Sequence, residues 1–299
     1  YERTGQVACR RRTVAHDHDF VELFLRLRQG KVGRCGTGYL HRFRLAHIAH
    51  EACRKVCRLR GYINTVSSVG VGHGGAARCG FFNDRRRERI ARCTLELGGK
   101  SAAIIADDFP IEAAAGLLTG TITMMSGQVC AMLSRVIVPR KRHDELASAI
   151  SAEMKKVVVG YSDDPTTQLG PVAMKRQLER IEMYIEEGKK TADLITGGGR
   201  PAHLNRGYFI EPTLFANVKN DSRIAQEEIF GPVLSLIPCD DEEDAIRIAN
   251  DSNYGLNGSV LTNDHERAYR IARRVRTGGF GQNGLRMDFG LPFGGFKQS

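Results

Sequence analysis

The charge of the chain changes abruptly near residue 93, and this change limits which part can build a packed core. Residues 1–93 hold 18 arginines and 2 lysines against 7 acidic residues, a net charge of +13. Residues 94–299 hold 24 basic and 27 acidic residues, a net charge of −3. Because arginine is rarely buried without a partner, we expect a compact domain at residues 98–299 and an irregular segment at residues 1–97.

The total charge of +10 would by itself suggest a nucleic-acid or anionic-surface partner. Its confinement to one segment argues against that class, and the rest of the chain has the composition of an ordinary globular protein. The apolar runs are too short to span a membrane, and the first residues lack the pattern of a secretory signal. We therefore expect a cytoplasmic protein with reduced thiols and no membrane partner.

Apolar periodicity after residue 94 predicts helices that alternate with short strands. The helical stripes are Leu146, Ile150, Met154 and Val157; Met174, Leu178, Ile181 and Ile185; and Ala268, Ile271, Ala272 and Val275. The predicted strands lie at residues 136–138, 233–237 and 259–261, and turns are expected at 197–199, 253–255 and 278–279. This alternation indicates the α/β class with a twisted, largely parallel sheet.

Glu96 is the first candidate for chemistry. It lies in TLELGGK at residues 94–100, between apolar neighbours and ahead of two glycines. A partly desolvated carboxylate at the end of a strand can act as a general base. The alternative is a glutamate on the surface or in a salt bridge, and this stretch alone does not decide between the two.

Cys130 is the second candidate, because it follows SGQV at residues 126–129. Glycine lets the backbone turn closely, so the thiol can open into a cleft beside backbone N–H groups that lower its pKa from about 8.5. A buried structural cysteine is the alternative. Cys239 precedes Asp240 and Asp241, whose charges disfavour a thiolate. We therefore expect Cys130 to be more reactive than Cys239.

Two further stretches carry less information by themselves. EEIFGPV at residues 227–233 places Glu228 and Phe230 ahead of a Gly-Pro turn. A carboxylate there can hold sugar hydroxyls and an aromatic ring can pack on a flat ligand, but an ordinary junction between a loop and a strand is equally consistent. PFGGFKQS at residues 292–299 is a glycine-hinged loop without evident chemistry.

Taken together and in this order, the motifs resemble the aldehyde dehydrogenase family. The matching stretches are LELGGKS at 95–101, GQVC at 127–130, EIFGPV at 228–233, NYGL at 253–256 and PFGGFKQS at 292–299. The resemblance covers residues 94–299, about two thirds of the chain. It implies an aldehyde dehydrogenase-like catalytic domain at 98–299, preceded at 1–97 by a poorly matching remnant of a Rossmann-like cofactor domain.

The resemblance implies an oxidoreductase that converts an aldehyde to a carboxylic acid with NAD or NADP as cofactor. Cys130 would attack the aldehyde to form a thiohemiacetal and then a thioester. The backbone N–H of Cys130 would help to hold the oxyanion, and Glu96 would activate the water that hydrolyses the thioester. The implied partners are a small-molecule aldehyde and copies of the same chain.

The resemblance also implies the residues that bind the cofactor. Glu228 would hold the nicotinamide ribose, and Phe230 would pack beside it. The backbone of Leu97 and Gly98 would lie against the nicotinamide, and Asn283 matches a family turn near the substrate end.

The match fails in places that bear on activity. FFNDRRR at residues 81–87 stands where the family has a glycine-containing turn near the cofactor, and Met125 stands where an asparagine is usual. The chain also stops inside a loop that the family continues toward a strand used in oligomer contacts. We therefore expect a fragment with weak nicotinamide binding, and off-frame translation is one hypothesis for residues 1–93. A catalytically impaired relative is the alternative function.

A basic zinc or nucleic-acid module in residues 1–93 is the remaining alternative. His47, His50, Cys53 and Cys57 have a spacing that zinc can use. Zinc sites usually pair two short Cys or His hairpins, whereas these four residues fall in one predicted helix. We expect no metal to bind there.

Overall fold

The computed structural model describes residues 95–286, 290 and 293–299. The predictions for the basic segment, for the zinc-like group at residues 47–57 and for FFNDRRR at 81–87 lie outside the described residues.

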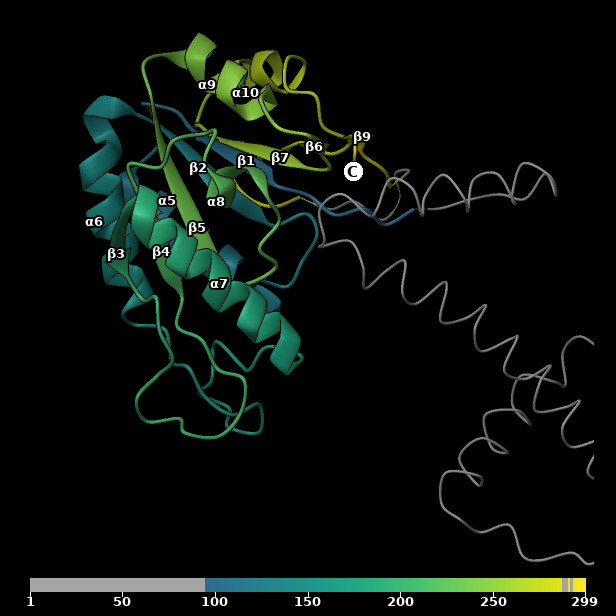
Figure 1. Cartoon of the computed structure of the whole chain (residues 1–299). Helices are drawn as coiled ribbons and strands as arrows, with labels where there is room; N and C mark the ends of the chain where they lie inside the picture. The colour runs from purple at the N-terminus through teal and green to yellow at the C-terminus, as the bar shows by residue number, and fades with distance from the viewer. Residues whose placement is uncertain (1–94, 287–289, 291–292) are drawn as a thin grey trace, which may run out of the picture. The chain divides into compact units, whose positions relative to one another are not determined.

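A seven-stranded sheet forms the centre of the described part, in the order β3-β4-β5-β2-β1-β7-β8 (Figure 1). Every neighbouring pair is parallel except the antiparallel pair β3–β4. The strands are β1 (Ser101–Ile105), β2 (Leu133–Pro139), β3 (Asp193–Thr196), β4 (Thr213–Ala216), β5 (Val233–Cys239), β7 (Gly258–Leu261) and β8 (Gly281–Gln282). The predicted α/β class and largely parallel sheet are therefore confirmed.

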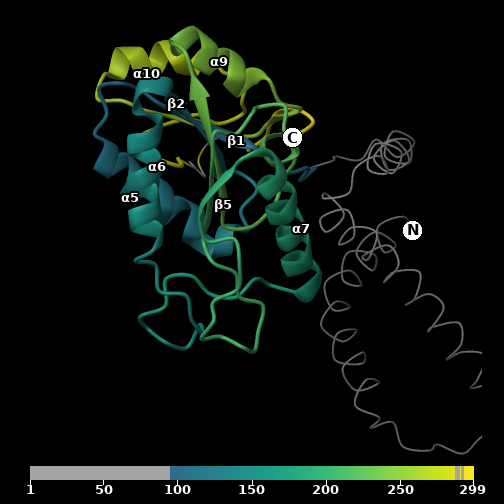
Figure 2. The same ribbon diagram turned by 60° about the vertical axis from the view of Figure 1, so that its left-hand side comes forward.

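Helices cover both faces of the sheet (Figure 2). They are α5 (Ile111–Thr123), α6 (His143–Met154), α7 (Lys175–Thr191), α8 (Arg223–Gln226), α9 (Glu242–Asn250) and α10 (His265–Ala272), with 3-10 turns η1 (Met124–Gly127) and η2 (Arg140–Arg142). Residues of α5 and α6 belong to one buried apolar cluster, and residues of α7, α9 and α10 to another.

The strands separate these two clusters by simple alternation. In β1, Ala102 and Ile104 face the cluster of α7, α9 and α10, whereas Ala103 and Ile105 face the cluster of α5 and α6. Successive strand residues point to opposite faces, so a strand covered on both sides must be apolar at nearly every position. This is why the buried strands appear in the sequence as continuous apolar runs.

The predicted helices and strands are present, with corrections at their ends. Met174 is the N-cap residue of α7 and is exposed, so the apolar stripe begins one residue before the helix. Val157 and Val275 lie beyond the ends of α6 and α10. The turn expected at residues 253–255 is wrong: Tyr254–Gly255 is strand β6, which pairs with Phe296–Lys297, strand β9.

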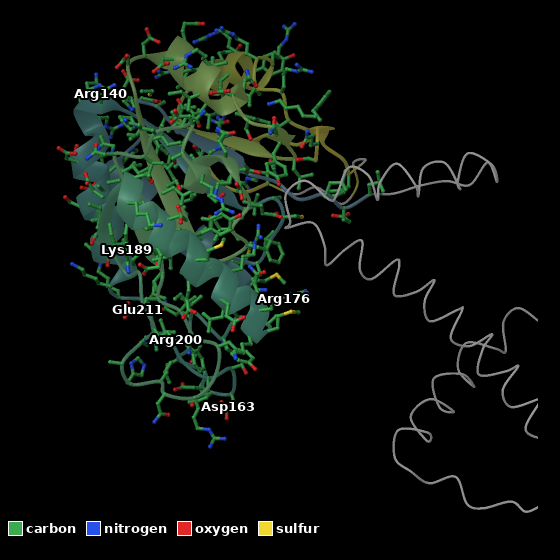
Figure 3. All side chains as sticks on the ribbon, in the orientation of Figure 1. Arg140, Asp163, Arg176, Lys189, Arg200 and Glu211 are labelled. Atoms are coloured by element: carbon green, nitrogen blue, oxygen red, sulfur yellow. The ribbon has the colours of Figure 1, made fainter. Side chains whose placement is uncertain are left out.

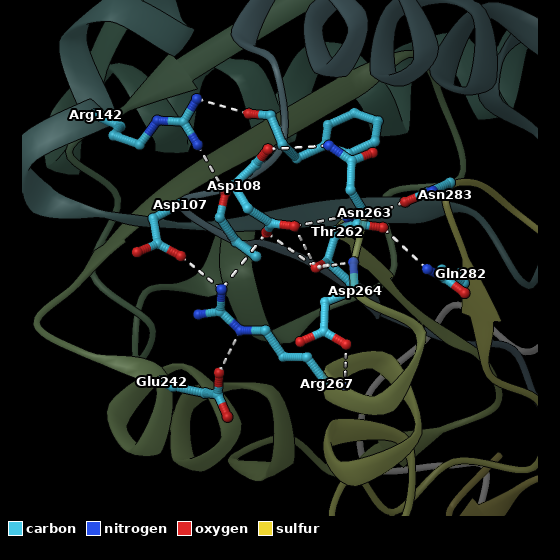
Figure 4. A network of polar contacts seen from close by, with 12 residues as sticks. Asp107, Asp108, Arg142, Glu242, Thr262, Asn263, Asp264, Arg267, Gln282 and Asn283 are labelled. Carbon is cyan, nitrogen blue, oxygen red and sulfur yellow. Dashed lines mark hydrogen bonds and ion pairs between the residues drawn. The ribbon is translucent and has the colours of Figure 1, made fainter.

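A network of hydrogen bonds and ion pairs connects the residues that follow β1 with those that follow β7, at the carboxyl ends of the two strands (Figure 4). Thr262 Oγ1 donates to both carboxylate oxygens of Asp108, at 2.9 and 2.8 Å, and the backbone N–H of Asn263 donates to the same group at 2.7 Å. Arg267 bridges Asp107 and Glu242. Asp107, Asp108 and Glu242 each contact Arg267 or a hydrogen-bond donor.

Two long loops, residues 155–174 and 197–212, form a lobe beyond the sheet (Figure 1, bottom). A small apolar cluster of Val159, Leu169 and Phe209 holds them together. Arg200 and Asp163 extend from this lobe in Figure 3. Within the described ranges, no helix is long and apolar enough to cross a bilayer.

Candidate functional site

Three loops carry the predicted site residues, and each precedes a parallel strand. Gly98 precedes β1, Cys130 precedes β2 and Glu228 precedes β5. Because β2 lies between β5 and β1 in the sheet, the three loops meet at the amino ends of neighbouring strands. This is the opposite end of the sheet from the Asp108 network.

The loop before Cys130 has an unusual backbone. Met125, Ser126 and Gly127 all have positive φ, at 49°, 57° and 69°. Left-handed conformations are unfavourable for residues other than glycine. Gly127 packs against the backbone of Gly231 and Pro232, where a Cβ atom would clash. Ser126 is buried, and its Oγ donates to the carbonyl of Gly170 at 3.0 Å.

Cys130 is half-buried, and its electrostatic surroundings differ from the prediction. Burial, followed by the charges of Glu96 and Glu228, raises the pKa of the thiol. The backbone N–H groups of Ala131 and of Cys130 itself act in the expected, lowering direction but are outweighed. The expected pKa depression was therefore wrong, because burial and then the charges of Glu96 and Glu228 outweigh the backbone N–H groups.

Glu96 differs from the prediction in its exposure. It lies in an irregular segment five residues before β1, and its side chain is exposed. Of the two alternatives for this stretch, the structure shows the exposed glutamate, because the buried strand begins only at Ser101. The charge of Glu96 nevertheless acts on the Cys130 thiol, so the chain brings acid and thiol into one neighbourhood.

Glu228 is the most enclosed acid of the site, at 9% exposure. Its Oε1 accepts a hydrogen bond of 3.1 Å from the backbone N–H of Gly99, 129 residues away in the sequence. Gly98 has a φ of +85°, and a Cβ there would lie 2.5 Å from Glu228 Oε2. Burial raises the pKa of Glu228 to about 7. The loop of Glu228 therefore comes this close only because residue 98 is glycine.

Leu97 and Phe230, the other predicted cofactor contacts, are both half-buried. Phe230 has a φ of 61°, so it is a further left-handed residue of the site. Phe230 and Glu228 line one small pocket with Gly99, Gly127 and Val129. The loops of Gly98, Cys130 and Glu228 thus contribute to one concave surface.

Gln177 and Arg180 of α7 hold the Glu228 loop, and the sequence did not single them out. Gln177 Nε2 donates to the carbonyls of Ile229 and Phe230, both at 2.9 Å. Arg180 Nη2 donates to the carbonyl of Glu228 at 2.7 Å. Polar residues three apart on one helix face can hold consecutive carbonyls, but only the fold reveals which loop they meet.

Arg135 and Lys100 are buried basic residues that the sequence analysis also missed. Arg135 is 2% exposed and donates to the carbonyls of Lys100, Ile248 and Ala249 and to Asn220 Oδ1, at 2.9 to 3.1 Å. It thereby ties β1 and β2 to the end of α9. A possible sequence signal was its place directly before the apolar run at 136–138.

Cys239 ends β5 and is 1% exposed. Burial, followed by Asp244, Asp240 and Asp241, raises the pKa of this thiol to about 12. The predicted effect of Asp240 and Asp241 is therefore present, although burial is the larger cause. Cys239 is less accessible than Cys130.

Asn283 does not lie with these residues. Its Oδ1 accepts from the backbone N–H of Thr262 at 2.9 Å, and its own N–H donates to Val260. These contacts are at the carboxyl end of β7, whereas Cys130 precedes β2 at the amino end, and the expected place of Asn283 near the substrate end stays a prediction. Among the described residues, no group of three or more His, Cys, Asp or Glu side chains could hold a metal ion.

Comparison with known proteins identifies the family. The model of the aldehyde dehydrogenase family matches residues 65–299, which begins 29 residues before the stretch on which the motifs were found. Geranial dehydrogenase of Castellaniella defragrans is 46% identical over 206 residues, covering 69% of this chain and 43% of that protein. A putative aldehyde dehydrogenase of Staphylococcus haemolyticus is 38% identical over 272 residues, covering 85% and 57%.

Solved structures agree with the sequence comparison. A Mycobacterium tuberculosis aldehyde dehydrogenase complexed with NAD+ has a TM-score of 0.70 and 48% identity, over 73% of this chain and 45% of that one. A mutant aldehyde dehydrogenase of Pseudomonas syringae with NAD+ and octanal has a TM-score of 0.71 and 35% identity, over 74% and 46%. The chain spans about half the length of the relatives it matches. It belongs to the aldehyde dehydrogenase family.

Proposed function

We propose that this chain carries the catalytic chemistry of an NAD- or NADP-dependent aldehyde dehydrogenase. One observation supports this most: Cys130 is half-buried, and its thiol pKa responds both to the backbone N–H groups of Ala131 and Cys130 and to the charges of Glu96 and Glu228. A cysteine that only filled the core would resemble Cys239, which is enclosed.

Cys130 is the nucleophile in this proposal. Its sulfur bonds to the aldehyde carbon, and the carbonyl oxygen gains negative charge as a thiohemiacetal forms. The backbone N–H groups of Ala131 and Cys130 favour negative charge on the sulfur, and donors of this kind can also stabilise an oxyanion. The raised thiol pKa means that a base must remove the proton before attack.

Glu96 is the base in this proposal. An exposed carboxylate within range of the sulfur can take a proton from the thiol, and later from the water that releases the acid from the thioester. Its exposure suits the second role, because the water must reach it from solvent.

Glu228, Phe230, Leu97 and Gly98 would hold the nicotinamide riboside. When bound, NAD or NADP supplies the acceptor for the hydride of the substrate. The fit is supported by an enclosed carboxylate beside a glycine that leaves no room for a side chain, with an aromatic ring lining the same pocket. Two ribose hydroxyls can donate to one carboxylate.

The proposed partners are a small aldehyde and further copies of the chain, without nucleic acid or membrane. Residues 94–299 carry a net charge of −3, which does not favour polyanions. Cys130 and Cys239 are free thiols, which suits a reducing compartment such as the cytoplasm.

The test has one arm with cofactor and one without. NADH or NADPH formation is followed with acetaldehyde, octanal and geranial as substrates. Acylation by p-nitrophenyl acetate, which needs no cofactor, is followed by intact-protein mass spectrometry. We expect both signals to be lost in Cys130→Ala and kept in Cys239→Ala, the matched control. Acylation of Cys130→Ala at the parent rate would exclude Cys130 as the nucleophile.

Glu96→Gln separates the two roles of the base. We expect this variant to become acylated at Cys130 but to release the acyl group at least about a hundredfold more slowly, the usual effect of removing a general base. Release at the parent rate would exclude Glu96 as the base for hydrolysis.

A further inference from the structure

One face of helix α7 contacts each residue of the loop at 227–231, which carries the proposed cofactor contacts Glu228 and Phe230. The contacts are hydrogen bonds at residues 227–230 and close packing at Gly231. The side chains of α7 that make them are Gln177, Arg180, Ile181 and Tyr184. Because residues three or four apart are neighbours on a helix surface, a single helix determines where this loop lies.

Gln177 makes the contact that depends most on the conformation of the loop. Its Nε2 donates to the carbonyls of Ile229 and Phe230, both at 2.9 Å. These carbonyls lie on either side of the Phe230 α-carbon, so their convergence on one amide group depends on the backbone angles of Phe230. Phe230 has a φ of 61°, which is unfavourable for a residue other than glycine. Gln177 therefore stabilises a conformation that Phe230 disfavours.

Arg180 and Tyr184 hold the acidic end of the same loop. Arg180 Nη2 donates to the main-chain carbonyl of Glu228 at 2.7 Å. Tyr184 is fully buried, and its hydroxyl donates to Glu227 Oε2 at 2.5 Å. The side chain of Glu228 accepts from the N–H of Gly99. The Glu228 carboxylate is thus fixed through its main chain by α7 and through its side chain by the loop before β1.

We propose that Gln177 is a positioning residue for the cofactor site. Through two carbonyls it fixes the left-handed Phe230, and it thereby sets the places of the Phe230 ring and the Glu228 carboxylate in the pocket that both residues line. The identity of the ligand in this pocket, a nicotinamide riboside, rests on the proposed function, whereas the fixing of the loop by Gln177 does not.

Amide hydrogen exchange in the full chain tests the positioning without any cofactor. The reporter is the N–H of Gly99, which donates to Glu228 Oε1, read by fragmentation mass spectrometry of the peptide at residues 95–101. Gln177→Met keeps the length of the side chain and removes both donors. We expect Gly99 to exchange at least about tenfold faster in this variant, as for the loss of two ordinary hydrogen bonds. Unchanged exchange would overturn the proposal.

Three further variants make this result specific. Gln177→Lys restores a donor and should return the exchange rate of Gly99 toward that of the parent. Arg176→Met changes the exposed neighbour on the same helix (Figure 3) and should leave the rate unchanged. If Gln177→Met does not fold, Gln177→Glu replaces it, because glutamate has a similar size but no N–H group. Failure of both to fold would show a need of the whole fold for Gln177, and the positioning role would be rejected.

Cofactor binding and acylation distinguish positioning from general damage. In Gln177→Met we expect NAD+ to bind at least about tenfold more weakly in calorimetric titration, while p-nitrophenyl acetate acylates Cys130 at the parent rate. The loop before Cys130 has its own anchor, the hydrogen bond from Ser126 to the Gly170 carbonyl. An equal loss of NAD+ binding and of acylation would indicate general damage and contradict a positioning role.

Glu228→Gln separates this inference from the proposed function. Faster Gly99 exchange in Gln177→Met, with NAD+ affinity unchanged in Glu228→Gln, would retain the fixing of the loop and reject the ribose role of Glu228. Weaker NAD+ binding in Glu228→Gln, with exchange and NAD+ affinity both unchanged in Gln177→Met, would retain the proposed function and reject the inference about Gln177.

Discussion

The two ends of the parallel strands are built differently. At the carboxyl end, Asp108 accepts hydrogen bonds from Thr262 and Asn263, and Arg267 bridges two further acids (Figure 4). The left-handed residue there is Asn283, a residue type that tolerates this conformation.

At the amino end, buried polar groups have fewer hydrogen-bond partners, and more residues other than glycine and asparagine have a left-handed backbone. Met125, Ser126 and Phe230 are left-handed without being glycine or asparagine. Glu228 is enclosed with one hydrogen bond to its side chain in the described part, from Gly99. Lys100 Nζ has no partner among the described residues.

This domain therefore gains stability at the carboxyl ends of its strands and loses some at their amino ends. Strained backbone and desolvated charges persist only where the surrounding fold holds them, and they gather at functional sites. The carboxyl end stabilises the sheet, whereas the amino end holds groups whose chemistry depends on being partly unsatisfied. Substitutions at the two ends should therefore affect stability in opposite directions.

The largest expected effect is a gain in stability from Glu228→Gln. The folded-state pKa of Glu228 is raised from 4.5 to about 7. The stability from this carboxyl is therefore complete below about pH 4.5 and is lost as pH rises through about 7. Glutamine keeps the acceptor for Gly99 and does not titrate. Urea unfolding should show the variant more stable by about 3 kcal/mol at pH 8, and equal to the parent at pH 4.

Glu211→Gln, at a half-buried acid of the lobe labelled in Figure 3, is the control and should show no such gain at pH 8. A Glu228→Gln variant less stable than the parent at pH 8 would mean that the buried Glu228 carboxylate does not destabilise the fold.

The next effect is a loss of stability from Asp108→Ala at the carboxyl end. Removing this acceptor leaves Thr262 and the N–H of Asn263 without their partner, which should lower the free energy of unfolding by about 2 kcal/mol. Alkylation of Cys130 should keep its parent rate. The same change at the exposed Asp163 should alter stability by less than about 0.5 kcal/mol. Slower Cys130 alkylation in Asp108→Ala would show that the two ends are coupled.

The smallest effect is a gain from Met125→Asn. Met125 is 72% exposed with a φ of 49°, so asparagine should relieve strain without losing burial and stabilise the fold by about 1 kcal/mol. Met124, also exposed, has an ordinary φ of −56°. Thermal unfolding should show a gain for Met125→Asn and none for Met124→Asn. Equal shifts in the two variants would remove strain as the explanation.

The sequence was sufficient where a short-range pattern decides the structure. The apolar runs at 136–138, 233–237 and 259–261 lie within β2, β5 and β7, because strands buried on both faces must be apolar throughout. Long-range contacts gave no such signal. The contact of Gly99 with Glu228 joins residues 129 apart, and the pairing of Tyr254 with Lys297 depends on a strand of two residues.

Charged residues were the least predictable part of the site. Lys100 and Arg135 carry side chains that are normally exposed, and only the packing of β1, β2 and α9 shows them to be buried. Glu96 presented the opposite case: its apolar neighbours suggested desolvation, but it precedes the buried strand and stays exposed. The motifs identified which residues carry chemistry, whereas burial and pKa depended on the fold.

Competitive alkylation distinguishes Cys130, at the amino end of the sheet, from Cys239 as the more reactive thiol. The folded chain is treated with limiting iodoacetamide, and the peptides that contain Cys130 and Cys239 are quantified by mass spectrometry. Cys130 is half-buried and Cys239 is 1% exposed, with a pKa of about 12. We predict that Cys130 is labelled at least about tenfold faster, since thiolate fraction and access both favour it. Faster labelling of Cys239 in protein shown to be folded would mean that Cys130 is not the reactive thiol of this domain.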